Sequence, residues 1–516
     1  MSPGKSESGF RRAMRAFLSS AHDAFQSARS SPIFSLLVLG FCLRLALAPF
    51  LTWTFDASFW YKSATDFMSG VGIYNSDTFS YPPLWAYTFL PFVWLLSLIV
   101  PPSYFGTYSE QFAAALPNMY MMVPTVTSPL FNLAFKLPLM IADALVGVMI
   151  YKVALGFTSE GNAKKAFLMW YFNPILILCS TIFGQFDVLP AMMAFLGVLL
   201  AYKKEYLFSG LSIGIGFLYK VWPAFLGPLL ALFAAGILVG EYRKNALLKS
   251  EAAGNGTNLP GKIGFSWCKM LVGFVLPSTI FLLCQLKNGI ITKVFELRVK
   301  YETVNGMNVW FWGIVPKFSG FALNLWENFH TPIMIVEILA ILAIAIFAFF
   351  AIQSGKTPAP QSFRVLLVCA VTSIATILLV SQKTNPDYLV WLLPFIIIES
   401  AAFGNFRKYV APLAIFGSLY YLSMAAIGLI STFAVYTNFI SPETIAKIYA
   451  AYLSIPGLVT GKLSSDVLFL ASFGGALTLF FIIVSGLKHM ISSAKGKNYE
   501  ASSPNNDFGD EGGASE

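Results

Sequence analysis

Long runs of apolar residues alternate with short polar segments along almost the whole chain. Each run is close to the roughly 20 residues that a helix needs to cross the hydrocarbon core of a bilayer. The expected membrane-spanning helices cover residues 33–52, 129–151, 166–182, 186–202, 206–219, 221–239, 266–285, 332–353, 365–380, 386–403, 409–431 and 466–487. We therefore expect an all-α polytopic membrane protein with about 12 transmembrane helices, in a range of roughly 10–14.

Two places leave the number of crossings open. Residues 206–239 fit one long helix or two helices broken at Lys220–Pro223, and we favour two because this keeps Arg243 on the cytoplasmic side. Residues 84–128 are apolar enough to cross, yet a single crossing would invert every later loop. We expect interfacial or re-entrant segments there, or an even number of crossings.

Positively charged segments between the runs predict the orientation, because Lys and Arg favour the cytoplasmic side. Both termini are then cytoplasmic. The large outer loops fall at about 53–128, 286–331 and 432–465, and a cytoplasmic linker falls at about 240–265. The chain divides into a basic N-terminal segment that suits a surface helix or a disordered tail, a membrane domain and a disordered cytoplasmic tail, at residues 1–31, 32–490 and 491–516.

Composition excludes a soluble globular protein. Hydrophobic residues make up 57% of the chain and charged residues only 11%, whereas soluble domains average about 25% charged residues. The formal net charge of +9 is typical of contact with anionic lipids, so we expect membrane lipids and not nucleic acid as partners. Five cysteines and three histidines are too scattered to predict a disulfide framework or a metal site, and no cofactor or metal is expected.

The first outer loop carries the acid that is best placed for chemistry. Asp56 follows directly after the first expected span, at the membrane–water boundary where a lipid phosphate would present a sugar. Glycosyl transfer needs a carboxylate to take the proton of the acceptor hydroxyl, and cations to stabilise the leaving phosphate. The alternative for Asp56 is an acid that caps a helix or snorkels to the interface.

Five groups of residues occur in the order found in the type C (multi-span) glycosyltransferases. They are Leu43-Arg44-Leu45 with Asp56, Asp66, Gly70, Tyr74 and Tyr81-Pro82; Lys136 with Asp143 and Tyr151-Lys152; Phe172-Asn173-Pro174 with Gly184–Asp187; Lys203-Lys204 with Lys220–Pro223; and Lys383 with Tyr388 and Trp391. The resemblance runs from about residue 36 to 400. It is strongest to the branch that contains the first mannosyltransferase of GPI-anchor assembly and other mannosyltransferases that use polyprenol-phosphate mannose.

This resemblance implies a type C helical bundle with a large first outer loop, a polyprenol- or dolichol-phosphate sugar donor, usually mannose, and inversion at the anomeric carbon. It also implies a first-loop acid as the essential base, and Asp56 matches the second acid of the family's Asp-x-Asp. Thr54 stands at the first acid, which argues against a paired-carboxylate metal site and leaves the subfamily and the acceptor open.

Three cations are candidates to bind the donor phosphate. Arg298 belongs to a basic cluster in the outer loop 286–331, where positive charge runs against the usual bias, and its guanidinium fork suits two phosphate oxygens. Lys220 lies at the outer break of a hairpin, where an interfacial anchor is the alternative. Lys383 precedes the segment that carries Tyr388.

The remaining candidates bind substrate or shape the site. Arg44 lies inside a span and is either functional or snorkels outward. A structural polar network is the favoured interpretation of Lys136 and Asp143, while Gln185 and Asp187 occupy a tight outer turn that binds substrate or fixes the loop. Further candidates of this kind are Asp66, Tyr81, Tyr388 and Trp391.

Three functions remain open on the sequence. The favoured one is a membrane glycosyltransferase that moves a hexose to a lipid or glycan acceptor on the outer or lumenal side. It would lie in the cell membrane of a prokaryote or in the endoplasmic reticulum of a eukaryote, with a small membrane partner subunit conceivable. One alternative is a transporter or lipid flippase, but such proteins tend to show two related halves with broken helices in matching positions, and this sequence shows no such pairing. The other alternative is a non-catalytic subunit of a glycosylation complex.

Overall fold

A computed structural model describes most of the chain. The described residues are 31–75, 79, 81–108, 125–249, 259–285, 304–354, 357–425, 428–437, 439–441, 443–444, 447, 451 and 462–494. The basic N-terminal segment, the C-terminal tail and Arg298 lie outside them.

Helices account for nearly all regular structure in these residues. The first half of the chain forms α2 (Phe34–Leu47), α3 (Thr54–Met68), α4 (Leu84–Ser97), α6 (Pro129–Leu155), α7 (Glu160–Tyr171), α8 (Pro174–Leu176), α9 (Val188–Tyr202), α10 (Tyr206–Tyr219) and α11 (Gly227–Lys249). The second half forms α12 (Leu259–Gln285), α14 (Pro316–Ile352), α15 (Ala359–Val380), α16 (Leu389–Ala402), α17 (Arg407–Ala425), α18 (Gly428–Thr437) and α20 (Lys462–Ala494).

Seven helical segments of the described chain are long and apolar enough to cross a membrane. They are Pro129–Leu155, Glu160–Phe183, Trp222–Asn245, Leu259–Thr279, Pro316–Ile352, Ala359–Val380 and Asp466–Ser493. Shorter apolar helices add to them at Phe34–Leu47, Leu84–Ser97, Val188–Tyr202 and Tyr206–Tyr219. The prediction of an all-α polytopic membrane protein is confirmed.

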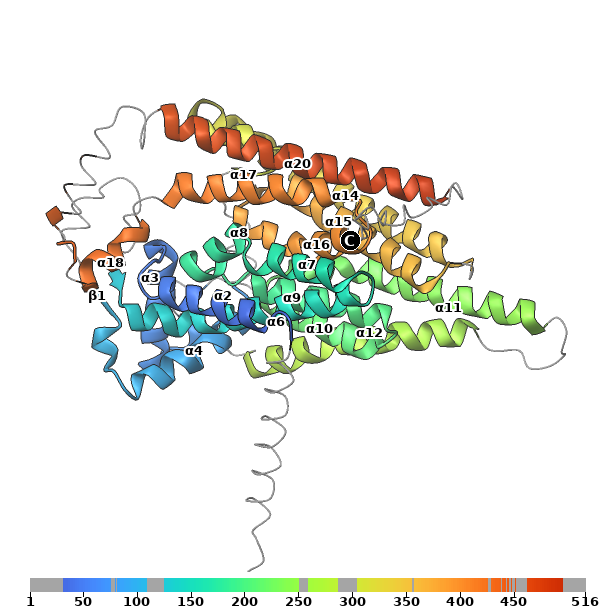
Figure 1. Ribbon diagram of the computed structural model, residues 1–516, viewed down its shortest axis with the longest axis horizontal. Helices are drawn as coiled ribbons and strands as arrows, with labels where there is room; N and C mark the ends of the chain where they lie inside the picture. The colour runs from blue at the N-terminus through green and yellow to red at the C-terminus, as the bar shows by residue number, and fades with distance from the viewer. Residues whose placement is uncertain are drawn as a thin grey trace, which may run out of the picture.

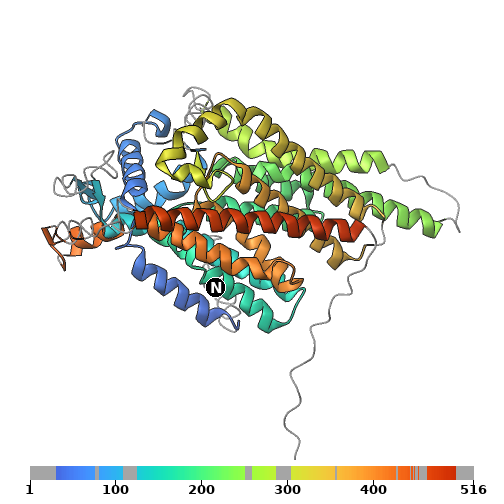
Figure 2. The same cartoon turned by 90° about the horizontal axis from the view of Figure 1, so that it is seen from above.

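The long helices run roughly along one axis and place the loops at two ends. Figure 1 shows α3, α4, β1 and α18 gathered at one end of the bundle, and the α11–α12 hairpin extending from the other. In both views α17 and α20 lie side by side along the bundle, as their mutual contacts require (Figures 1 and 2). Two small sheets complete the fold: antiparallel β1–β2 (Gly106–Tyr108 with Thr125–Thr127) and parallel β3–β4 (Asn305–Gly306 with Lys383–Thr384).

The chain does break at Lys220–Pro223, so residues 206–239 form two helices as predicted. α10 ends at Tyr219, a short 3₁₀ segment η4 (Trp222–Leu226) follows, and α11 begins at Gly227. Lys220 takes an extended backbone conformation at the end of α10, and Pro223 has no N–H to continue the helical hydrogen bonds.

Several loops are shorter than the sequence suggests. α14 begins at Pro316 and includes Pro332, so the last part of the expected outer loop 286–331 is helical. The expected start of this span, Pro332, lies inside α14, because one proline removes a single N–H hydrogen bond without ending a long apolar helix. The expected linker at 240–265 shrinks in the same way, because α11 runs to Lys249 and α12 begins at Leu259. Helices α3 and α4 occupy much of the expected loop 53–128.

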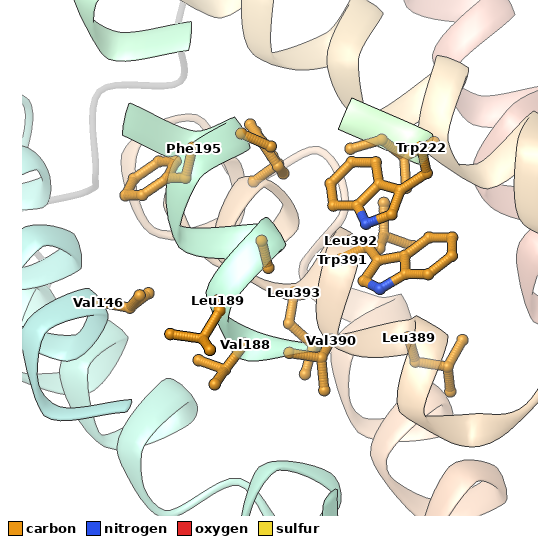
Figure 3. Packing of buried hydrophobic residues seen from close by; sticks show 14 of the residues in the cluster. Val146, Val188, Leu189, Phe195, Trp222, Leu389, Val390, Trp391, Leu392 and Leu393 are labelled. Atoms are coloured by element: carbon orange, nitrogen blue, oxygen red, sulfur yellow. The ribbon is translucent and has the colours of Figure 1, made fainter. Parts of the chain in front are cut away.

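Close helix packing forms the core that carries the site. A Cβ atom on Gly210 of α10 would lie 1.9 Å from the Met270 carbonyl oxygen of α12, so only glycine allows these two backbones to approach. Where α9 and α16 meet, buried aliphatic side chains interdigitate between the two helices (Figure 3). The residues labelled there are Val146, Val188, Leu189, Phe195, Trp222, Leu389, Val390, Trp391, Leu392 and Leu393.

Candidate active site

Asp56 lies in the first turn of α3, and its side chain contacts Gln185. The N-cap residue is Trp53, whose side chain makes no capping hydrogen bond, and Asp56 is the acid of the first turn. Gln185 donates a 2.5 Å hydrogen bond from Nε2 to Asp56 Oδ2. Two residues that are 129 positions apart in the sequence thus meet through their side chains.

Aromatic packing fixes the helix that carries Asp56. Trp60 lies one turn after Asp56 on the same face of α3. Its ring packs 6.0 Å from the ring of Phe186, the residue next to Gln185, and Trp85 of α4 stacks on Phe186 at 5.0 Å. Since Trp60 and Phe186 are both buried, this contact sets the separation between Asp56 and Gln185.

The turn that presents Gln185 depends on a glycine. A π-helical segment (Ile177–Phe183) ends at Gly184, which has φ +70° in the left-handed region. A Cβ atom on Gly184 would also lie 2.5 Å from the Phe135 ring. The backbone N–H of Gln185 then donates to the Cys179 carbonyl oxygen at 2.9 Å, so the turn is rigid and its side chain points to Asp56.

The Asp56 carboxyl has the protonation behaviour of a base. Although part of the residue surface remains exposed, protein surrounds the carboxyl, and burial raises the pKa of Asp56 from 3.8 to about 7. Lys220, Lys383 and the Gln185 hydrogen bond lower this pKa less than burial raises it, and Asp187 adds to the rise. A carboxylate that gains a proton near pH 7 is well matched to general-base catalysis.

Lys220 is buried and paired with acids. Its Nζ donates to Asp187 Oδ1 at 2.6 Å and lies 3.9 Å from Asp387 Oδ2. Trp391 donates a second hydrogen bond to Asp187 Oδ1 at 2.7 Å. Asp187 and Asp387 together raise the pKa of Lys220 against the opposing effect of burial, so it is a cation held between two acids.

Asp387 is the residue that sequence reasoning missed. It lies in the 3₁₀ segment η7 (Pro386–Tyr388), directly before Tyr388. Burial and the neighbouring Asp187 carboxylate raise the pKa of Asp387 well above its ordinary value. Its position shortly after Lys383 was visible in the sequence, but nothing there showed that the segment returns to Lys220.

Four aromatic rings surround the Lys220 ammonium group. Its Nζ lies 4.7 Å from the Tyr388 ring centre, 5.0 Å from Phe186, 5.6 Å from Trp391 and 5.9 Å from Tyr81. Trp222 stacks on Trp391 at 4.8 Å, as Figure 3 shows, and Tyr388 stacks on Trp391 at 4.4 Å. The predicted site-shaping residues Tyr81, Tyr388 and Trp391 therefore gather around one cation.

Lys383 lies on the β4 loop, which a second segment of the chain supports. Asn305 and Gly306 pair with Lys383 and Thr384, and Asn308 donates to the Ser381 carbonyl oxygen at 2.7 Å. Burial lowers the pKa of Lys383, while Asp387 and Asp56 oppose that shift. Within the described residues Lys383 forms no ion pair, in contrast to Lys220.

Arg44 and Asp143 form a separate buried ion pair within the helices. Arg44 Nε donates to Asp143 Oδ2 at 3.0 Å, and both side chains are fully buried. Arg44 also donates to the Tyr171 carbonyl oxygen at 2.7 Å, and Ser180 donates to Asp143 Oδ2 at 2.5 Å. Arg44 does not snorkel outward, because this network ties α2 to α6 and to the π-helical segment.

Lys136 contacts backbone rather than Asp143, although both lie on α6. Its Nζ donates to the carbonyl oxygens of Ala48, Leu51 and Ile182 at 3.1, 2.8 and 2.9 Å. Ala48 and Leu51 follow the end of α2, and Ile182 lies at the end of the π-helical segment. Carbonyl oxygens at helix ends lack helical hydrogen-bond donors, and Lys136 supplies them. Lys136 thus joins the backbone leading to α3 to the backbone leading to Gln185.

Asp66 lies away from this assembly. It pairs with Lys62 at 3.0 Å on the partly exposed side of α3, and this lysine is its ion-pair partner among the described residues. Arg298 lies outside the described residues, so its predicted phosphate contact stays a prediction. Among the described His, Cys, Asp and Glu side chains, no group of three or more is placed to hold a metal ion. Metal independence likewise stays a prediction.

Comparison with known proteins gives one partial similarity. No protein-family model matches the chain. Over 136 residues the chain is 25% identical to GPI mannosyltransferase 1 of Debaryomyces hansenii, which covers 25% of this chain and 33% of that protein. The chain therefore matches a third of the length of this relative. Together with the apolar helices, the similarity supports an integral membrane protein related loosely to membrane glycosyltransferases.

Proposed function

We propose that the protein is a membrane glycosyltransferase that moves a hexose, mannose by similarity, from a polyprenol- or dolichol-phosphate donor to a hydroxyl group of a lipid or glycan. One observation carries the proposal: at one end of an apolar helical bundle, the Asp56 carboxyl accepts a hydrogen bond from Gln185 and lies within reach of the charges of Lys220 and Lys383. By the orientation expected from basic loops, this end faces the outer or lumenal side.

In the proposed reaction Asp56 is the only proton acceptor. The acceptor oxygen forms a bond to the anomeric carbon while the bond from that carbon to the phosphate oxygen breaks. The hydroxyl proton passes to Asp56, and the electron pair leaves with polyprenol phosphate. Direct displacement inverts the anomeric carbon. Gln185 holds Asp56 through Oδ2, which leaves Oδ1 to receive the proton.

Lys383 is the proposed cation for the donor phosphate. Asp187 already pairs with Lys220 and Asp387 lies beside it, so a phosphate would have to compete with the Asp187 carboxylate there. Lys383 has no such ion pair among the described residues, and its charge acts on the Asp56 carboxyl. In a partly buried site, a lysine–phosphate contact stabilises the leaving group as its charge grows. Lys220 is then a positioning residue, because it holds Asp187, which also accepts a hydrogen bond from Trp391.

An apolar cavity suits the isoprenoid chain of the donor. The cavity has a volume of about 390 Å³ and lies between α10, α11 and α12. Ala224 of η4 and Gly227 of α11 line it, and Trp267, Met270 and Phe274 line its side on α12. Ala224 belongs to η4, which also carries Trp222, the ring that stacks on Trp391. A chain in this cavity would therefore begin next to the aromatic wall of the site.

The test is turnover of the proposed donor. The purified protein in nanodiscs is given polyprenol-phosphate mannose and a mixture of glycolipid acceptors, and released polyprenol phosphate is measured. We expect release by the wild type and its loss in Asp56→Asn, with Asp66→Asn as the matched control on the same helix. Donor that binds but never turns over would identify a non-catalytic subunit or a flippase instead.

A further inference from the structure

A polar cavity, separate from the apolar cavity between α10, α11 and α12, lies at the end of the bundle opposite to Asp56. It has a volume of about 460 Å³ and lies between the first turn of α17 and the last turns of α20. Figure 1 places these helix ends away from α3 and α18. The cavity is lined by Asn405, Lys408, Tyr409, Phe481, Val484, Ser485, Lys488, His489 and Ser492.

The lining of this cavity is basic, without an acid among its residues. Lys408 and Lys488 form no ion pair within the described part of the chain, and three hydroxyl groups lie among the lining residues. The neighbouring acid, Glu399, is buried and already accepts from Asn405 Nδ2 and from the Phe406 N–H. Arg364 adds a further cation next to the cavity, since it donates to Oδ1 of the lining residue Asn405 at 2.9 Å. The cavity thus presents positive charge that no described carboxylate neutralises.

The backbone of α17 adds to this positive potential. The helix begins at Arg407, so the positive end of its dipole lies at the cavity. Its first turn contains no acid and instead carries Arg407 and Lys408. Two cations at the positive end of a helix repel that end unless an anion lies close to them.

Apolar side chains continue from the cavity along α20. Phe481 and Val484 line it and are 46% and 43% exposed, and Leu477 of the same helix is 40% exposed. A ligand with a phosphate head and an apolar chain could therefore place the head between Lys408 and Lys488 and the chain along α20. A basic pocket between the ends of two membrane helices is typical of anionic lipid sites.

We propose that the cavity between α17 and α20 binds a phosphate group, presented by an anionic membrane lipid, through Lys408 and Lys488. The hydroxyl groups of Ser485 and Ser492 supply further donors. This site is independent of the proposed transfer reaction, because it lies at the other end of the bundle from Asp56.

The test titrates the full-length protein in detergent with phosphatidic acid and follows the unfolding midpoint, which rises when a ligand binds the folded state. Two variants probe the site separately. Lys408→Gln with Lys488→Gln removes the charges, and Ser485→Trp fills the cavity without changing the charge. The control is Lys164→Gln with Lys165→Gln on α7, which removes the same charge from residues outside the cavity.

The wild type and the control should show the same saturable rise in midpoint. In both cavity variants the lipid concentration for half of that rise should increase by about tenfold or more, as expected from the loss of charge-assisted contacts. Inorganic phosphate distinguishes the sources: competition with the lipid means that the phosphate group alone suffices, and no competition means that the site needs the lipid chain. Identical titrations of wild type, control and both cavity variants would overturn the proposal.

Discussion

Replacing Asp56 by asparagine should stabilise the protein, and by an amount that depends on pH. The folded protein raises the pKa of this carboxyl from 3.8 to about 7. A raised carboxyl pKa means that the folded state holds a proton that the unfolded chain releases. The free energy of unfolding is therefore highest, as far as Asp56 is concerned, below about pH 4. It falls as the pH rises towards about 7 and does not change further above that. Asparagine cannot ionise, so the variant lacks this dependence.

The magnitude follows from the pKa shift. Each pKa unit corresponds to about 1.4 kcal/mol, so a shift of about 3 units destabilises the ionised folded state by on the order of 4 kcal/mol. Between about pH 5 and pH 8, the wild type should lose about 3 kcal/mol relative to the variant. The asparagine amide oxygen of the variant can still accept the hydrogen bond from Gln185, so little is lost on the variant side.

The assay is thermal unfolding of both proteins in one detergent across that pH range. Asp66→Asn is the control, because Asp66 belongs to the same helix and is paired with Lys62 at the surface. The unfolding midpoint of Asp56→Asn should exceed that of the wild type by a margin that grows from about pH 5 to pH 7 and then stays constant. A margin that is the same at every pH, or that Asp66→Asn reproduces, would refute the burial argument.

Three further predictions test other parts of the account. Lys383→Gln should raise the KM for the polyprenol-phosphate donor by about 10–100-fold with little change in the unfolding midpoint. Lys220→Met should instead lower the unfolding midpoint, because it leaves Asp187 and Asp387 buried without their cation. Equal effects of the two substitutions would contradict the separate roles of the two lysines. Gly227→Trp should raise the KM for long-chain donors and spare short-chain isoprenoid donors, because Gly227 lines the apolar cavity and a Cβ atom there meets no atom within 4 Å. Gly264→Trp is the control, since a Cβ atom at Gly264 is equally unhindered and Gly264 does not line the cavity. An effect on both donors would exclude the cavity. Asp143→Asn should destabilise the protein by about 3–5 kcal/mol, measured as loss of folded protein on heating, since it leaves the buried Arg44 charge unpaired; normal stability would show that the ion pair is dispensable.

The sequence predicted the helices well because hydropathy reports the physical requirement of the bilayer. It also predicted the break at Lys220–Pro223, where charge counting and proline agree with the structure. It misplaced the start of α14, because a proline inside a membrane helix looks like a boundary when its neighbours are unknown.

The site could be predicted only as a set of residues, without their pairings. The resemblance named Asp56, Gln185, Asp187, Lys220 and Lys383, and the structure brings them into one region. The resemblance could not show that acids hold Lys220, or that Trp391 donates to Asp187, which lies 204 residues away in the sequence. Nor could it show that Arg44 pairs with Asp143 across 99 residues, because local patterns carry no information on such distances.

The pH dependence of donor turnover tests the central claim most directly. With Asp56 as the base, kcat/KM of the wild type should rise about tenfold per pH unit below about 7 and level off above it. Residual turnover by Asp56→Asn should be lower by about 10²–10⁴-fold and should not follow that curve. A wild-type rate that stays constant from about pH 5 to pH 8, or an unchanged rate in Asp56→Asn, would contradict the account.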